Sequence, residues 1–394
     1  MTAAATAVDL TDRVRRVAAV AREHARRTDD EAVFPTEALA ELRASGLLAL
    51  VVPAAYGGLG GGPAELVDCA ESLARADLSV ALIFAMHCQQ VATVARYGGD
   101  ELRATLLPRV AAGERYLASV TTSAGTGGHL LSATAPLRDT EEGLLIERFA
   151  PIVTGGAHAD GFLITMGSPG ADASGQAGQV CLVYAEREQL RITESGRWQP
   201  MGMRASHSVA LQLTGTVPRH QMIGPEHGFR EISLALFSPL AHLGWAACWL
   251  GSAAGALSRV ATLLRSPEGR RRFDHRSELL LTRLARARHR IDAVHALLRH
   301  TQHVVEEGGE LSTAPVQMLL NGLKVTAAES CRQAVEELVD AVGLRHGYFK
   351  DSDTYLERVL RDLRSASLNY HNDRLDLADG RHVLLDRKVT HVGG

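Results

Sequence analysis

Histidine side chains are the first candidates for chemistry in this chain of 394 residues. Near neutral pH an imidazole can act as a general base or as a hydrogen-bond donor. His371 follows Tyr370 in a polar stretch near the C-terminus, and His87 lies in the apolar segment 84–90. Each also has a plainer interpretation: His371 as a surface-loop histidine, and His87 as a histidine whose bonds are satisfied within the core.

Threonine hydroxyls form a second set of candidates. Thr154 begins the segment Thr-Gly-Gly-Ala-His-Ala-Asp, and Thr121 and Thr122 are adjacent. Such groups can bond the polar edge of a bound ligand, although β-branched residues are also simply good strand formers. The five cysteines are scattered without a CxxC pair, so we expect no metal site and a reduced, cytoplasmic protein.

The composition is that of an ordinary globular protein, with 46% hydrophobic residues, 22% charged residues and a formal charge of −3. This balance does not favour a nucleic-acid or membrane surface, so we expect neither as a partner. The stretch 232–255 contains no charged residue and is long enough to cross a bilayer. Its small residues, together with Pro239 and His242, favour a buried helix instead.

The spacing of apolar residues predicts the helices and strands that must position these side chains. Apolar residues recur at helical spacing up to about Tyr116, including one apolar helix from about Leu66 through Ala95. Short β-branched runs separated by glycine and proline follow, at 144–146, 151–154, 162–166, 179–184 and 209–213. Helical segments return from Glu231. We therefore expect an α+β protein with an N-terminal helical domain (1–116), a central β-barrel or sandwich domain (117–225) and a C-terminal four-helix bundle (226–394).

The order of several motifs resembles that of the acyl-CoA dehydrogenase superfamily. They cover nearly the whole chain and read Val-Pro-Ala-Ala-Tyr-Gly-Gly (52–58), Thr-Gly-Gly-Ala-His-Ala-Asp (154–160), Met-Gly-Met-Arg-Ala-Ser (201–206) and Leu-Glu-Arg-Val-Leu-Arg-Asp-Leu-Arg (356–364). The resemblance implies that family's fold, a flavin cofactor such as FAD, and a homo-oligomer, either a tetramer or a dimer.

The same resemblance implies roles for individual residues. Thr154 would bond flavin N5, and Thr121 and Thr122 would face the pyrimidine edge of the ring. Arg204 and Ser206 would belong to a loop that supports the flavin from behind; the alternative for both is an ordinary ion pair at the start of a strand.

The chain departs from the family pattern where the catalytic glutamate is expected. His371 stands at one known position of that base, and Ala241 stands at about the other. The diphosphate motif keeps Arg270 and Phe273 but has Asp274 in place of glycine, and the adenine motif keeps only Gly343. An added carboxylate near a diphosphate weakens binding by charge repulsion.

These departures favour one branch of the superfamily, the two-component monooxygenases. They receive reduced FAD or FMN from a separate reductase and oxygenate a small molecule in biosynthesis through a flavin C4a-hydroperoxide, as N- or C-hydroxylation. His371, and less directly His87, would then be the catalytic side chains. Two alternatives stay open: an acyl-thioester dehydrogenase with a non-standard base, and a catalytically silent partner subunit.

Overall fold

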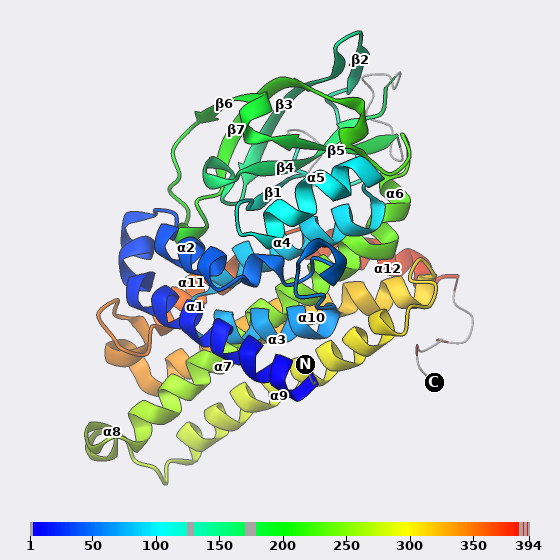
Figure 1. Cartoon of the computed structure of the whole chain (residues 1–394). Helices are drawn as coiled ribbons and strands as arrows, with labels where there is room; N and C mark the ends of the chain where they lie inside the picture. Colours follow the sequence, from blue (N-terminus) through cyan, green and yellow to red (C-terminus); the bar gives the residue numbers. More distant parts are fainter. Residues whose placement is uncertain (1–2, 124–129, 170–178, 386–388, 390–391, 393–394) are drawn as a thin grey trace.

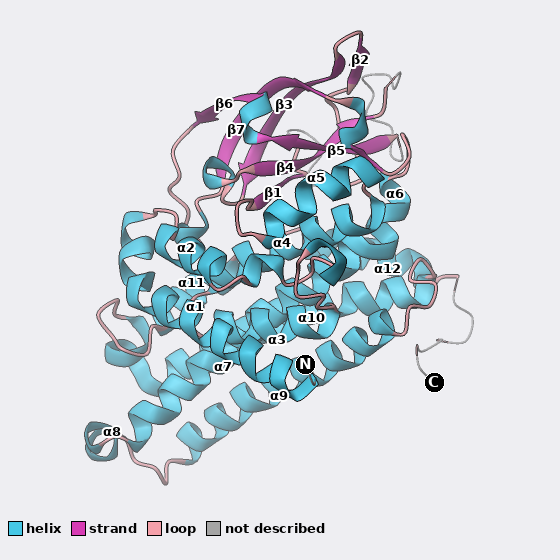
Figure 2. Cartoon of the chain, viewed as in Figure 1, coloured by secondary structure: helices cyan, strands magenta, loops and turns pink. Residues whose placement is uncertain are grey.

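The computed structural model describes residues 3–123, 130–169, 179–385, 389 and 392. A helical N-terminal part precedes a central part of strands, and a second helical part follows (Figures 1 and 2). The expected fold class is therefore confirmed. The N-terminal helices are α1 (Ala3–Glu31), α2 (Thr36–Ala44), α3 (Pro63–Ala74), α4 (Leu78–Tyr97) and α5 (Asp100–Ala111).

One predicted helix is in fact two. The apolar stretch expected to run continuously from about Leu66 is interrupted between α3 and α4. Asp77 adopts an extended backbone there, and its carboxylate accepts a hydrogen bond from the Val80 backbone N–H at 3.0 Å. This is an N-cap, which satisfies one of the free donors at the start of a helix. The apolar pattern alone did not reveal the break because both helices are buried.

The strands of the central part are β1 (Leu117–Val120), β2 (Arg138–Thr140), β3 (Gly143–Val153), β4 (Gly161–Gly167), β5 (Val180–Glu186), β6 (Leu190–Ser195), β7 (Val209–Val217) and β8 (Met222–Ile223). They form two four-stranded sheets, with orders β1-β4-β5-β8 and β2-β3-β7-β6. Only β1 and β4 pair in parallel among these strands; the other pairs in the described residues are antiparallel. The register of β3 on β7 shifts between Ala150 and Val153, directly before Thr154.

The charge-poor stretch 232–255 is buried, as predicted. It begins in α6 (Phe229–Ile232), passes through a π-helical turn (Ser233–Phe237) and continues into α7 (Ser238–Arg265). By length and composition alone, α4 and the stretch Phe229–Arg265 could cross a membrane, but 83% and 72% of their apolar windows are buried inside the protein. Small residues allow α7 to approach α3 closely, since a Cβ on Gly251 would lie 2.1 Å from the Glu71 carbonyl oxygen.

The remaining helices form the C-terminal part beside α7. They are α8 (Pro267–Arg272), α9 (Glu278–Glu306), α10 (Ala314–Gly343), α11 (Leu356–Arg364) and α12 (Asn372–Val383). The sheets lie at one end of the helical body, with α4 and α5 directly beneath them, and α8 lies at the far end (Figure 1). The N-terminal part, the sheets and the C-terminal part therefore meet around α4, β1 and the start of α7.

Candidate functional site

A small cavity lies where the three parts of the chain meet. Its volume is about 60 Å³, which suits a few water molecules and is well below the roughly 300–1,000 Å³ of a typical ligand pocket. A larger ligand must therefore displace part of the wall. The lining residues come from α4, the end of β1, the start of α7 and the segment before α12; they are Met86, Gln89, Ser119, Thr121, Leu130, Phe237, Ser238, Ala241, His242, Trp245 and Tyr370.

His242 lines this cavity, and its hydrogen bond shows which of its two ring nitrogens carries the hydrogen. Its Nδ1 lies 3.2 Å from the carbonyl oxygen of Leu320. Because a carbonyl only accepts, Nδ1 carries the hydrogen, and the neutral ring keeps a lone pair on Nε2. No described residue bonds Nε2. Burial, reinforced by the charge of Lys324, lowers the pKa of His242 to about 3, so the ring is neutral at physiological pH. A residue that lines the cavity thus carries an unbonded hydrogen-bond acceptor.

Tyr370 contributes an aromatic wall and a hydroxyl. Its ring centroid lies 6.2 Å from that of His242, and burial raises the pKa of its phenol. The backbone of Tyr370 has φ +54°, a left-handed conformation that is uncommon for a non-glycine residue and typical of functional sites. His371 follows at the start of α12, where its side chain is exposed and does not line the cavity.

A buried lysine holds the segment that carries Tyr370. Lys324 donates hydrogen bonds to the carbonyl oxygen of Ala366 at 3.1 Å and to Oδ1 of Asn372 at 2.7 Å. Its ammonium also lies 5.7 Å from the Trp249 ring centroid, as a cation–π contact. Burial lowers the pKa of Lys324 to about 8. These contacts clamp both sides of the turn at 367–371, which fixes the unusual conformation of Tyr370.

The π-helical turn borders the cavity and is itself held by a side chain of α4. Gln89 donates from Nε2 to the carbonyl oxygen of Phe237 at 2.7 Å, and Gln90 donates to Oε1 of Gln89 at 3.0 Å. Single π turns inside helices are rare and occur frequently at functional sites. The amide of Gln89 thus binds a carbonyl at the turn, while the rest of its side chain faces the cavity.

A row of hydroxyls lies at the end of β3 and brings together two of the predicted flavin-facing residues. Ser206 Oγ lies 2.8 Å from Ser208 Oγ, and Ser208 donates to Thr154 Oγ1 at 3.0 Å. Thr154 is therefore an acceptor in this row, and its own hydroxyl hydrogen is available to a ligand. Nearby, Thr122 donates to the carbonyl oxygen of Ile152 at 2.9 Å, and the Ile152 side chain is 54% exposed.

These groups fit the chemistry of an isoalloxazine ring. Its polar edge requires a few hydrogen-bond donors and acceptors, and its faces require apolar contacts. Thr154 offers a hydroxyl donor, Ile152 offers an uncovered apolar side chain, and Thr121 lines the cavity. The residues would hold such a ring at the junction of the sheets with α7.

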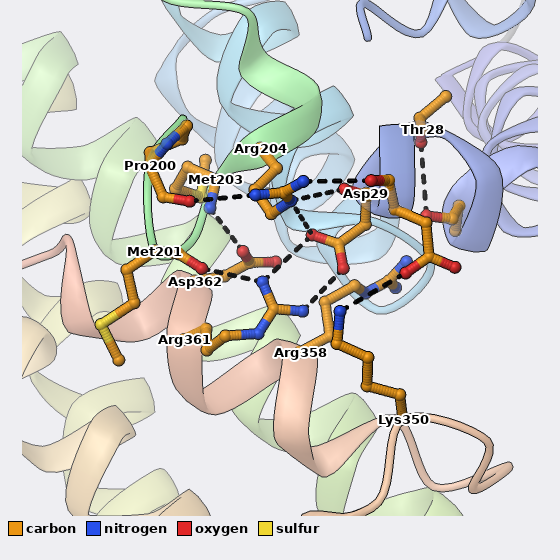
Figure 3. Close-up of polar contacts among 12 residues, drawn as sticks. Thr28, Asp29, Pro200, Met201, Met203, Arg204, Lys350, Arg358, Arg361 and Asp362 are labelled. Carbon is orange, nitrogen blue, oxygen red and sulfur yellow. Dashed lines mark hydrogen bonds and ion pairs between the residues drawn. The ribbon is translucent and has the colours of Figure 1, made fainter. Parts of the chain in front are cut away.

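Arg204 points toward Asp29 of α1 (Figure 3). It donates from Nε to the carbonyl oxygen of Asp29 at 2.6 Å and from Nη2 to that of Asp30 at 3.0 Å. Arg361 on α11 binds the side-chain carboxylate of Asp29 at 2.6 Å and donates to the carbonyl oxygen of Met201 at 2.9 Å. Arg204 therefore ties the loop 200–206 to the N-terminal helix, which is closer to the ion-pair interpretation than to direct flavin contact.

The same loop is anchored from below by Asp362. Its carboxylate accepts a hydrogen bond from the Met203 backbone N–H at 2.5 Å (Figure 3). Burial raises the pKa of Asp362 to about 7, against the opposing effect of Arg358. Asp362 and Arg361 are the Arg-Asp pair of the last sequence motif, so that motif serves to fix the loop that ends at Ser206.

The residues expected at the adenine and diphosphate end lie elsewhere. Arg270 is on α8, which lies at the far end of the helical body from the sheets (Figure 1), and Gly343 ends α10. Phe273 lies 5.9 Å, ring to ring, from His346, so these two motifs are close to each other. Gly343 has φ +70°, a conformation that suits glycine. Within one chain they do not join Thr154.

His87 lies in the core with its hydrogen bonds satisfied, which is the plainer of the two interpretations offered by the sequence. Nε2 lies 2.9 Å from the carbonyl oxygen of Leu48, and Nδ1 accepts from the Leu117 backbone N–H at 3.0 Å. Burial lowers its pKa to about 4. Both ring nitrogens are bound to backbone, so the side chain joins α4 to β1 and to the segment after α2.

No carboxylate lines the cavity in the part of the chain that the structure describes. Ala241 is in the wall, at the position where some relatives would carry the base. Across the described residues, no group of three or more His, Cys, Asp or Glu side chains is placed to hold a metal ion. The site offers hydroxyls, a neutral imidazole and aromatic rings.

Neither His242 nor Gln89 is among the site residues predicted from the sequence. His242 was noted only as a polar residue in a charge-poor helix, and Gln89 only as part of the segment 84–90. The signal available for both was a polar side chain in an otherwise apolar, buried helix, which is costly unless it is hydrogen-bonded or functional.

Comparison with known proteins agrees with the motif order. The family described as "Acyl-CoA dehydrogenase, N-terminal domain" matches residues 5–114, and "Acyl-CoA dehydrogenase, C-terminal domain" matches residues 243–373. Dibenzothiophene monooxygenase of Rhodococcus qingshengii is 26% identical over 232 residues, which are 57% of this chain and 55% of that protein. The chain thus spans about half the length of this curated relative.

Two further similarities extend along more of the chain. The probable acyl-CoA dehydrogenase fadE25 of Mycobacterium tuberculosis is 26% identical over 352 residues, covering 86% of this chain and 85% of that protein. The structure of FMN-bound TdsC from Paenibacillus sp. A11-2 superposes with a TM-score of 0.84 at 20% identity, covering 96% and 98% of the two chains. With both domain patterns matched in order on this fold, the chain belongs to the acyl-CoA dehydrogenase superfamily.

Proposed function

We propose that this protein is a flavin-dependent monooxygenase that receives reduced flavin from a separate reductase and oxygenates a small aromatic molecule. The observation that carries the proposal is the composition of the cavity wall. It contains a neutral His242 and the phenol of Tyr370 and, among the described residues, no carboxylate that could remove an α-proton. A dehydrogenase of acyl thioesters needs a positioned base at this point.

The wall suits an aromatic substrate with an N–H or O–H group. Phe237, Trp245 and Tyr370 provide aromatic surface, and Nε2 of His242 provides the acceptor. The bound flavin would supply the electrons that activate dioxygen. The protein would orient the substrate through His242, exclude water with the aromatic wall, and hold the polar edge of the ring with Thr121, Thr122, Thr154 and Ser206.

The named relatives support this direction. Dibenzothiophene monooxygenase is among the curated relatives, and TdsC from Paenibacillus sp. A11-2 has been solved with FMN and with indole. Both molecules named for these proteins are aromatic. At identities of 26% and 20%, the substrates of these relatives do not carry over to this chain, so its substrate class is inferred from its own cavity wall.

An acyl-thioester dehydrogenase is the second candidate, because the similarity to fadE25 extends over 86% of the chain. It would require a base from outside the described cavity wall, such as His371, which lies next to Tyr370 but is exposed. A catalytically silent subunit would have no use for the free acceptor of His242.

We also expect a homo-oligomer in the cytoplasm. Arg270 and Phe273 lie on or directly after α8, at the far end of the helical body from the sheets, so a flavin bound at Thr154 would reach them with its adenine half only on a second copy. Large apolar side chains beside Gly343 are exposed, with Leu344 at 70% and Tyr348 at 66%. An oligomer would cover them.

The test compares indole with N-methylindole, which keeps the aromatic rings but has a methyl group in place of the N–H donor. Reduced FMN or FAD is mixed with the protein, air and each compound, and oxygenated product is measured by mass spectrometry. The native protein should favour indole over N-methylindole by about 3- to 10-fold, the worth of one neutral hydrogen bond. His242→Phe should abolish this preference, and His371→Gln should retain it.

The outcomes separate the candidates. If native protein and His242→Phe prefer indole over N-methylindole to the same extent, His242 does not take part in substrate recognition. If no compound is oxygenated with reduced flavin, and the bound flavin is instead bleached anaerobically by butyryl-CoA, the protein is a dehydrogenase. If it shows neither reaction and no flavin affinity in either redox state, it is a silent subunit.

A further inference from the structure

Arg148 is a buried cation in the middle of the sheet region. It lies on β3, in register with Leu213 of β7, and its side chain points inward with those of Ile146 and Ala150. The residue is only 1% exposed. Burial lowers the pKa of its guanidinium to about 10, so the group still carries its charge at neutral pH.

Neutral partners surround this charge. Nη2 donates to the carbonyl oxygen of Thr122 and to Ser123 Oγ, both at 2.7 Å, and Nη1 donates to the carbonyl oxygen of Phe149 at 3.1 Å. Nε is buried without a partner. No carboxylate in the described part of the chain lies within ion-pair distance. A desolvated guanidinium is unfavourable without a counter-ion, and the described residues place none beside Arg148, so its charge is available to a bound anion.

The guanidinium is joined to both loops that would face the flavin. Thr122, whose carbonyl it binds, is bonded through its hydroxyl to the carbonyl oxygen of Ile152, two residues before Thr154. Thr121, the preceding residue, lines the cavity. The positive charge is therefore bonded to the residue beside Thr121, and one further hydrogen bond connects that residue to the segment before Thr154.

We propose that Arg148 is a positioning residue whose fixed charge makes this site selective for the reduced, anionic form of the flavin. This inference rests on the proposed function. Reduced flavin becomes an anion when its N1 proton is lost, whereas oxidised flavin has a neutral ring. A buried positive charge stabilises the former and has little effect on the latter. The site would thereby accept reduced flavin from a reductase and release it once it is oxidised.

The experiment measures dissociation constants of oxidised and chemically reduced FMN anaerobically. At an effective dielectric constant of about 20, a unit charge within about 10 Å contributes roughly tenfold to such an equilibrium. Native protein should bind reduced FMN at least about tenfold more tightly, which for a two-electron couple corresponds to a midpoint potential about 30 mV above that of free FMN. Arg148→Met should remove most of this ratio, and Arg148→Lys should keep it.

A matched control removes the same charge from the surface of the same sheets. Arg219 is exposed, with 53% of its side chain accessible, and pairs with Asp139, so Arg219→Met should leave the ratio unchanged. Equal weakening of both redox forms in Arg148→Met would show a purely structural role and overturn the inference while the proposed function stands. If Arg148→Met does not fold, a native ratio near one overturns the inference equally well. Native protein that binds neither form overturns both proposals.

Discussion

The close approach of α3 and α7 leads to a stability prediction that depends on a single hydrogen atom at Gly251. Replacing that hydrogen with a methyl group, as in Gly251→Ala, would place Cβ 2.1 Å from the Glu71 carbonyl oxygen. This is about 1 Å closer than two such atoms tolerate, and the neighbour is helix backbone that cannot rotate away. The two helices must separate, although each is packed into the core.

The magnitude follows from two opposing terms. Overpacking a tight contact costs about 1–3 kcal/mol. Alanine in a helix interior is favoured over glycine by about 0.5–1 kcal/mol, which offsets part of that cost. Gly322 provides the matched control, because it lies in α10 and a Cβ there would meet nothing within 4 Å. The difference between the two variants isolates the steric term.

The assay is urea unfolding followed by far-ultraviolet circular dichroism at one protein concentration. Gly251→Ala should have a lower midpoint than native protein, and Gly322→Ala an equal or higher one. The two variants should differ by about 1–3 kcal/mol in the free energy of unfolding. A Gly251→Ala midpoint at or above that of Gly322→Ala would show that α3 and α7 do not meet as described.

Two further predictions concern buried polar groups. His87→Phe leaves the Leu48 carbonyl and the Leu117 N–H without partners. Each lost partner should lower the free energy of unfolding by about 1–3 kcal/mol, measured by thermal or urea unfolding. Native stability with lost activity would instead make His87 a catalytic residue. Asp362 has a pKa raised from 3.8 to about 7, so the folded state binds more protons than the unfolded state between these values, and the stability due to this group is lost as pH rises through about 7. Asp362→Asn does not titrate, so its stability relative to native protein should rise between about pH 5 and pH 8, and a relative decline over that range would refute the assignment.

The sequence predicted the order of the three parts and the type of most elements because hydrophobic periodicity reports local geometry. The strand candidates at 162–166 and 209–213 lie within β4 and β7, and the candidate at 179–184 begins one residue before β5. The candidates at 144–146 and 151–154 proved to belong largely to one long strand, β3, with Pro151 at its register shift. Strand β1 was missed because its four residues carry no alternation; all of them are buried.

The candidate site was harder to predict because it is assembled from residues far apart in the chain. Thr154 and Ser206 were named together and share a hydroxyl row. His242 needed coordinates, since only the tertiary fold shows that Leu320 takes up one ring nitrogen and leaves the other free. The burial of Arg148 was not predicted, because an arginine in an alternating strand normally indicates the solvent face. Here its side chain points inward.

The π-helical turn at Ser233–Phe237 also acts on the helix as a whole, by changing its phase. Each residue of an α-helix advances by about 100°, and one additional residue in a turn rotates everything beyond it by that amount. Before the turn, Phe229 and Ile232 pack into the apolar cluster beneath the sheets. After it, Ala241 and His242 face the cavity. A single inserted residue thus lets one continuous helix meet two differently oriented surfaces. The direction in which the His242 side chain faces is therefore set by the length of this segment as much as by its residue types.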